Sequence, residues 1–123
     1  MGCGRLFEGT PQQMWASLQK LAALPDDTTV YCAHEYTLDN LAFAAIAEPG
    51  NRAVEARIAE AGRMRAAGLP TVPALLGLEK LTNPFLRTSA PELVAAAERF
   101  AGRPLHGGAE VFAVVRRWKD SLD

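Results

Sequence analysis

The sequence predicts an α+β chain, in which a short α/β part precedes a mostly helical part. Residues 28–33 are β-branched and aromatic, which is typical of a buried strand. A capped amphipathic segment before them and several segments with helical apolar spacing after them predict helices on both sides. The length of 123 residues is that of one domain or a fragment of one.

The first helix is expected to begin after Thr10, because its hydroxyl can cap the helix and Gln13 completes the pattern of a capping box. Apolar side chains then recur at helical spacing, at Met14, Leu18 and Leu21. The strand follows after a proline-containing turn. Since one strand cannot form a stable sheet, we expect its neighbours to be supplied by something outside this chain.

Two helices are expected after the strand. Thr37 is a candidate cap for the first, whose apolar side chains are Leu38, Leu41, Ala45 and Ile46. The second is expected to run from Asn51 to about Gly68, with Val54, Ile58 and Ala61 on its apolar face and Arg57, Glu60 and Arg63 on its outer face. Residues 71–87 are punctuated by prolines and are expected to be irregular.

Two more helices are expected near the end of the chain. Ser89 can cap a helix that starts at Pro91 and stops at Gly102. The last helix carries Val111, Val115 and Trp118 at positions i, i+4 and i+7.

Composition excludes several classes of partner. The 123 residues have a formal net charge of −1, so no global basic field attracts nucleic acid or an anionic membrane. No apolar run reaches the roughly 20 residues of a membrane span, and no charged leader precedes an apolar stretch. Cys3 and Cys32 do not form a disulfide framework. We expect reduced cysteines and a cytoplasmic protein, with no nucleic-acid or membrane partner.

His34 follows the predicted strand and is the one candidate metal ligand, because neutral imidazole is a good donor to zinc or iron. The alternative is a histidine that is simply hydrogen-bonded at a strand end. A catalytic metal needs about three protein ligands. His106 is the only other histidine and sits in a predicted surface turn, so we do not expect this chain alone to build a metal centre.

Arg116 and Lys119 are three residues apart on the last predicted helix, so their charged ends lie on one side and could hold a carboxylate. The alternative is that the macrodipole favours cations near a helix C-terminus without any ligand. Arg5 lies in a glycine-rich segment that lacks the spacing of a nucleotide-binding loop and could be a tight turn. No residue has the context of a catalytic nucleophile, and we assign no catalytic residue.

Four motifs in order resemble those of glyoxalase II. They are GCGRLFEGTP at residues 2–11, CAHEYT at residues 32–37, TNPFLR at residues 82–87 and RRWKD at residues 116–120. The resemblance implies two domains: residues 1–37 as the C-terminal part of a metallo-β-lactamase αββα sandwich, and residues 38–123 as a helical glutathione-binding domain. It also implies hydrolysis of S-D-lactoylglutathione to D-lactate and glutathione in methylglyoxal detoxification, by a hydroxide held on two zinc, iron or manganese ions.

The resemblance also implies roles for individual residues. His34 matches a ligand of the second metal ion. Arg5, Tyr36, Arg116 and Lys119 match positions that contact the glutathione part of the substrate. Phe7 falls where some members carry tyrosine, so a hydroxyl contact would be lost there.

The sequence departs from the family in lacking most of the metal ligands, including the Thr-His-x-His-x-Asp-His motif. We therefore expect that this chain alone does not hold the two ions, and that its partner is a missing N-terminal metal-binding portion. Met1 is then an internal methionine of a longer parent or the start of a truncated gene. The alternatives are an inactive helical remnant, serving as a glutathione-binding or interaction module, and a product without function.

Overall fold

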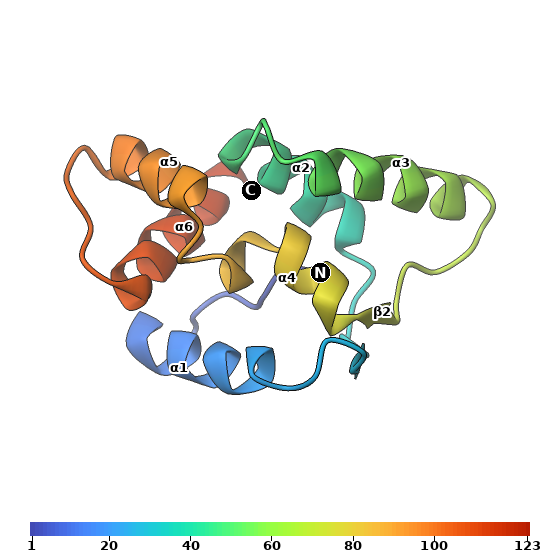
Figure 1. The fold of residues 1–123 in the computed structure, drawn as a ribbon, viewed down its shortest axis with the longest axis horizontal. Coiled ribbons are helices and arrows are strands. Elements are labelled where there is room, and N and C mark those ends of the chain that lie inside the picture. The colour runs from blue at the N-terminus through green and yellow to red at the C-terminus, as the bar shows by residue number, and fades with distance from the viewer.

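The computed structural model describes residues 1–123 and is mostly helical (Figure 1). The elements are α1 (Pro11–Ala22), β1 (Thr29–Val30), α2 (Thr37–Ala47), α3 (Arg52–Ala66), β2 (Ala74–Leu75), α4 (Leu76–Thr82), the 3₁₀ helix η1 (Pro84–Leu86), α5 (Pro91–Ala101) and α6 (Gly108–Leu122). The strands β1 and β2 form the one sheet, so the layered αββα sandwich is not present in this chain. None of the helices combines the length and the apolar character required to cross a bilayer.

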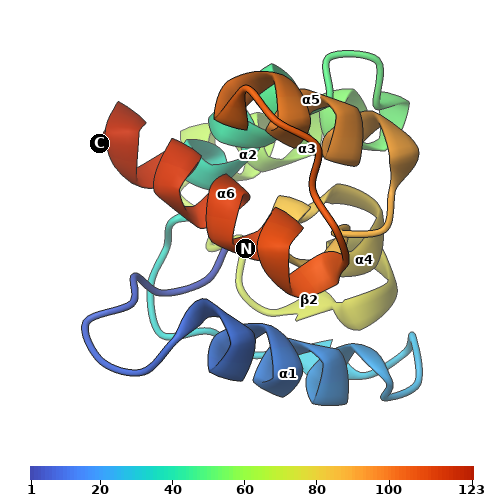
Figure 2. The same ribbon diagram turned by 90° about the vertical axis from the view of Figure 1, so that its left-hand side faces the viewer.

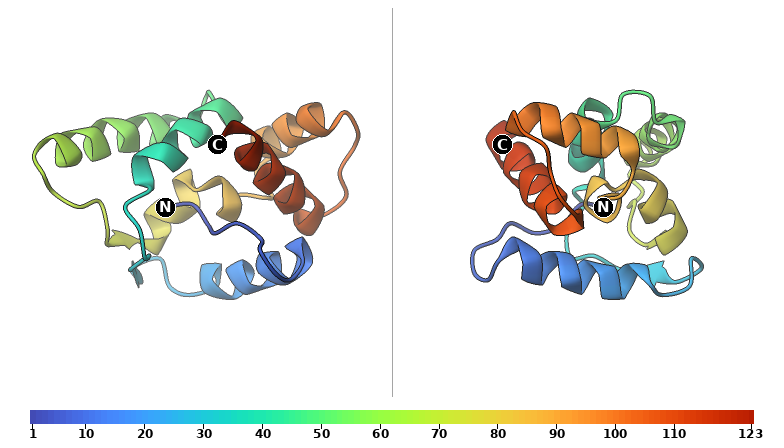
Figure 3. Two further views of the ribbon diagram at one scale, coloured as in Figure 1. Left: turned by 180° about the vertical axis from the view of Figure 1, so that it is seen from behind. Right: turned by 60° about the vertical axis from the view of Figure 1, so that its left-hand side comes forward.

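The helices form two sides with α4 and η1 between them (Figures 1 and 2). Helix α1 lies on one side, where it contacts α6 and η1. Helices α2, α3 and α5 lie along the opposite side. Seen from behind, the N-terminus lies near the middle of the molecule and the end of α6 comes up beside α2 (Figure 3). This arrangement brings the two ends of the chain toward the start of α2.

The main hydrophobic core contains Phe43, Phe85, Leu93 and Phe112, each at most 2% exposed. Trp118 contacts the ring of Phe43 edge to face, at 5.4 Å between ring centroids. Side chains from residues 1–37 pack against the same core, at Cys3, Leu6, Met14, Trp15 and Leu18. Side chains from both ends of the chain therefore contribute to this core.

Local helix signals predicted from the sequence are confirmed in most places. Thr10 and Gln13 form the capping box of α1, and α3 begins directly after Asn51, close to the predicted start. The Asn51 side chain also caps α3 by accepting from two backbone N–H groups, a role that was not predicted. Gly102 ends α5 in the left-handed conformation, at φ 72°. Val111 and Val115 are buried on α6.

Two predicted caps are wrong. Thr37 is the first residue within α2, which is preceded by Tyr36, and its hydroxyl accepts a hydrogen bond from Thr71 instead of capping the helix. The residue before α5 is Ala90, and no side chain caps that helix, so Ser89 does not have the predicted role.

The predicted strand at residues 28–33 is shorter and more exposed than expected. Only Thr29 and Val30 form β1, which pairs antiparallel with β2, and Tyr31 is 78% exposed. Because β2 is itself only two residues long, it offers no further residues to extend the pairing with β1. The region of residues 71–87 was expected to be irregular, yet it contains β2, α4 and η1.

The predicted apolar faces of α1, α2 and α3 are wrong in part. Leu38 and Ile46 are 40% and 55% exposed, and α2 instead buries Phe43 and Ala47 beside Leu41. Leu21 of α1 is 55% exposed as well. Arg57, placed on the outer face by its charge, is only 6% exposed, because Glu79 of α4 forms an ion pair with it.

Candidate functional site

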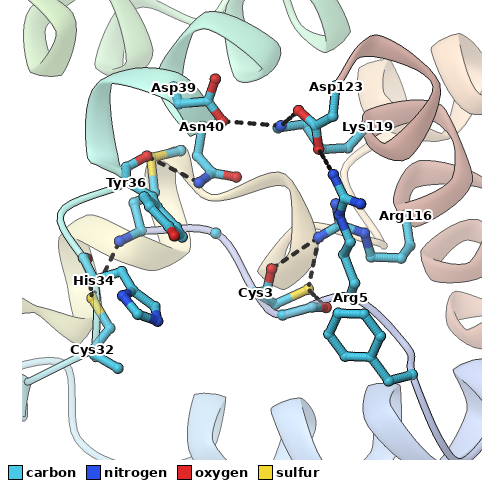
Figure 4. A pocket seen from close by; sticks show the side chains of 15 residues that line it. Cys3, Arg5, Cys32, His34, Tyr36, Asp39, Asn40, Arg116, Lys119 and Asp123 are labelled. Carbon is cyan, nitrogen blue, oxygen red and sulfur yellow. Dashed lines mark hydrogen bonds and ion pairs between the residues drawn. The ribbon is translucent and has the colours of Figure 1, made fainter.

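A pocket of about 710 Å³ opens between the N-terminal segment, the turn after β1, the start of α2 and the end of α6 (Figure 4). All six residues predicted as site residues line it: Arg5, Phe7, His34, Tyr36, Arg116 and Lys119. They come from three segments that are far apart in the sequence. The fold therefore brings together the positions that the motifs single out.

The floor of the pocket is the segment that begins at Met1. Gly2 adopts φ 97°, and a Cβ added there would lie 2.5 Å from the side chain of Asn40. Only glycine accommodates both the positive φ and this close approach. The segment can therefore run directly against α2, which leaves its other side facing the pocket.

Arg116 is buried under this segment and is only 4% exposed. Its Nη1 donates to the backbone oxygen of Cys3 at 2.9 Å, and its Nε and Nη2 donate to Asp120 at 3.1 and 2.7 Å. The guanidinium carbon lies 4.8 Å from the centre of the Phe85 ring, a cation–π contact. Arg116 is therefore held by partners within the chain rather than by solvent.

Lys119, also 4% exposed, points between two carboxylates (Figure 4). Its Nζ lies 3.0 Å from Asp39 Oδ2 and also contacts Asp123 Oδ1. Burial alone would lower the pKa of Lys119, but hydrogen bonds to Asp123 and Asp39 outweigh it, and the net pKa is raised. The bond from Lys119, with a further one from Arg5 at 3.0 Å, lowers the pKa of Asp123.

Each cationic side chain at the pocket has a carboxylate partner. Arg5, Arg116 and Lys119 pair with Asp39, Asp120 and Asp123. An anionic ligand at Lys119 therefore competes with protein carboxylates, whereas the half-exposed Arg5 side chain also faces solvent. Sequence reasoning missed Asp39, because it lies eighty residues before Lys119 and no local pattern connects the two.

His34 stands apart from this charged cluster. Its ring stacks on Tyr36 at 4.8 Å between centroids, with 18° between the planes. The neighbouring Glu35 is occupied by hydrogen bonds from the side chain and backbone of Thr71, which lower its pKa. No group of three or more His, Cys, Asp or Glu side chains is placed to hold a metal ion. The donors present in this chain therefore do not fit a site for two ions.

Both cysteines line the pocket as free thiols, and they differ in environment. Burial raises the pKa of the Cys3 thiol, and the hydrogen bond from Arg116 offsets this only in part. Cys32 is exposed.

We expect thiol reagents to modify Cys32 before Cys3 at neutral pH, by at least about tenfold in rate, because the reactive species is the exposed thiolate. Mass spectrometry of the chain after timed exposure to iodoacetamide would locate each modification. Equal rates at the two positions would contradict the burial of Cys3.

Comparison with known proteins adds a second kind of observation. A family model described as "Hydroxyacylglutathione hydrolase C-terminus" matches residues 35–122. A protein of Pseudomonas fluorescens (strain SBW25) named hydroxyacylglutathione hydrolase is 56% identical over 121 residues, which is 98% of this chain and 48% of that protein. One of the same name from Halorhodospira halophila (strain DSM 244 / SL1) is 58% identical over 120 residues, or 98% of this chain and 47% of that protein. The chain spans about half the length of these curated relatives.

Proposed function

Because this chain belongs to the hydroxyacylglutathione hydrolase family, we propose that it forms the glutathione-binding part of a thioester hydrolase of that kind. The substrate class is a hydroxyacyl thioester of glutathione, with S-D-lactoylglutathione as the expected member in methylglyoxal detoxification. The observation that supports this most directly is the meeting of Arg5, Tyr36, Arg116 and Lys119 in one pocket.

The chemistry of the pocket suits the peptide part of such a substrate. Glutathione is a tripeptide with carboxylates at both ends and an ammonium group beside one of them. Arg5 and Lys119 both contact Asp123, so a substrate carboxylate that displaces Asp123 inherits two cations. Asp39 then remains on the rim as a possible partner for the ammonium group. Phe7, 89% exposed, offers an apolar contact without a hydroxyl.

Arg116 has a different part in this proposal. Its nitrogens are already hydrogen-bonded to Cys3 and Asp120, and its guanidinium is buried against Phe85. It therefore supports the floor of the pocket through the Cys3 carbonyl, while its charge is paired with Asp120. Arg5 and Lys119 are the cations that exchange a protein carboxylate for a substrate carboxylate.

The complete enzyme is proposed to use two divalent metal ions, zinc, iron or manganese, in the cytoplasm. His34 supplies one ligand, and the others come from the portion of the relatives that this chain does not match. The chain alone is therefore proposed to be inactive, and no step of the reaction is assigned to its own side chains. Residues 1–37 belong with the metal-binding domain in this view, and residues 38–123 with the glutathione-binding domain.

Reconstitution tests the proposal. We expect no hydrolysis of S-D-lactoylglutathione by this chain with zinc, and measurable hydrolysis when it is mixed with the unmatched amino-terminal portion of the Pseudomonas fluorescens relative. His34→Ala should lower the rate in the mixture by at least about tenfold, because a catalytic metal site needs about three protein ligands. His106→Ala is the matched control, since that histidine is exposed and does not line the pocket.

Each alternative predicts a different result. Turnover by the chain alone, with tightly bound metal, would show that the ligand count is wrong. An inactive mixture in which the chain still binds glutathione would support a binding module without catalysis. A chain that does not bind glutathione would contradict the proposed function.

A further inference from the structure

Asn83 does not line the site pocket, yet it contacts the segment that forms the pocket floor. It lies where α4 ends and η1 begins, and it is 3% exposed. Its Nδ2 donates to the backbone oxygen of Gly2 at 3.0 Å. Asn83 belongs to the motif at residues 82–87, but the proposed function assigns it no role.

The floor segment is held from three directions. Asn83 holds the oxygen of Gly2, Arg116 holds the oxygen of Cys3 at 2.9 Å, and the Asn40 side chain packs where a Cβ of Gly2 would be. Of these three contacts, the one from Asn83 comes from outside the pocket, since Asn40 and Arg116 line it. The path of the segment toward Arg5 therefore depends on a group that no ligand in the pocket touches.

Asn83 is itself fixed by buried partners. Its Oδ1 accepts from the backbone N–H of Phe85 at 3.1 Å, and its Nδ2 also donates to Glu79 Oε2 at 3.2 Å. Glu79 in turn pairs with Arg57 at 2.7 Å, and all three side chains are at most 6% exposed. Buried polar groups with satisfied partners specify one arrangement, because each alternative leaves a charge or a dipole unpaired. Buried polar contacts therefore connect Arg57 on α3, through Glu79 and Asn83, to Gly2 in the pocket floor.

We propose that Asn83 is a positioning residue for the glutathione site, which sets the place of Arg5 and of the Cys3 carbonyl by holding the Gly2 oxygen. This inference rests on the proposed function. It differs from a purely structural role, in which Asn83 only caps η1 through its Oδ1. The cap uses Oδ1, whereas Nδ2 donates to both Gly2 and Glu79. The cap can therefore be separated from the Gly2 contact, and the signals of the floor segment report that contact itself.

Asn83→Ser separates them, because serine caps a helix well but is too short to reach Gly2. We expect the Kd for glutathione, measured by titration calorimetry on the full chain, to rise about five- to tenfold, the factor that one lost hydrogen bond corresponds to. The amide NMR signals of Gly2, Cys3 and Gly4 should shift at the same time. Asn83→Thr, a second short and uncharged side chain with a capping oxygen, should give the same direction of change.

The control is Leu93→Ala, a fully buried change on α5 that removes core packing at a residue that does not line the pocket. It should lower the melting temperature while leaving the Kd within about twofold of the wild type, a change well below that of one hydrogen bond. If the wild type binds glutathione and Asn83→Ser binds it with the same Kd, the inference is overturned and the proposed function still stands. Failure of both Asn83 variants to fold would assign the residue to the fold alone and also overturn it. A wild-type chain that does not bind glutathione would overturn the proposed function itself.

Discussion

Replacing Arg57 by leucine is expected to lower the free energy of unfolding by about 3–5 kcal/mol, the cost of leaving one member of a buried ion pair without its partner. Arg57 Nη2 lies 2.7 Å from Glu79 Oε1, and its Nη1 donates to Thr82 at 2.8 Å. After the change, Glu79 keeps Asn83 as a neutral donor, while the N-terminal ammonium is 3.9 Å away. Urea unfolding followed by circular dichroism measures the loss.

Two further variants show whether the pair accounts for this loss. Arg63→Leu is the matched control on the same helix, because its ion pair with Glu60 is 70% and 60% exposed and should contribute at most about 1 kcal/mol. Arg57→Leu combined with Glu79→Leu should recover much of the stability, since no unpaired charge remains buried. A double variant as unstable as Arg57→Leu alone would mean that packing, and not charge, explains the effect.

The burial of Arg57 illustrates what could not be predicted from the sequence. Along α3 the residue falls among other charged positions, and only a carboxylate 22 positions later makes its burial favourable. The capping box at Thr10 and the cap at Asn51 were predictable, because each cap and the N–H groups it binds lie within three residues of one another. Signals that are complete within one helical turn can be read from the sequence, whereas pairings between elements cannot.

The strand at residues 28–33 was mispredicted for a related reason. Its β-branched residues predict extended backbone, but the length of a strand is set by the strand beside it, and β2 offers two residues. The buried side of α2 differs from the predicted one, because Phe43 and Ala47, rather than Leu38 and Ile46, meet α5 and α6. The sequence correctly predicted that α2 carries apolar residues, but it did not show which side of the helix is buried.

The site residues were predicted on different grounds from the helices. The chemistry of His34, Arg116 and Arg5 alone was equally compatible with purely structural roles. The order of the four motifs was what singled out the six pocket residues. The contact of Asp39 with Lys119 was not anticipated, because it forms only after α2 and α6 have come together. Asp123 lies four residues after Lys119, so that pairing could have been read from the sequence and was missed. The pairing of the pocket cations therefore depends only in part on the fold.

Lys119→Ala is expected to raise the Kd for glutathione by about 10- to 100-fold, since a hydrogen bond to a charged group contributes roughly 1.5–3 kcal/mol. The change also leaves Arg5 and Arg116 facing three carboxylates, so the remaining field repels a substrate carboxylate. Lys119 has a raised pKa, so its charge is lost only as the pH rises through a value above 10.5. Asp123 has a lowered pKa, so its charge is lost only as the pH falls through a value below 3.8. Titration calorimetry at pH 7 therefore compares fully charged pairs.

Arg117→Ala provides the control for this measurement. Arg117 is the exposed residue between Arg116 and Trp118 on α6, and it does not line the pocket. Both variants remove one positive charge from the same helix, so a general electrostatic effect lowers the affinity in both and weakens with added salt. A specific contact lowers it in Lys119→Ala alone. Equal affinities for the wild type and the two variants would mean that glutathione leaves the Lys119 ion pairs intact, and that its carboxylate is held elsewhere than between α2 and α6.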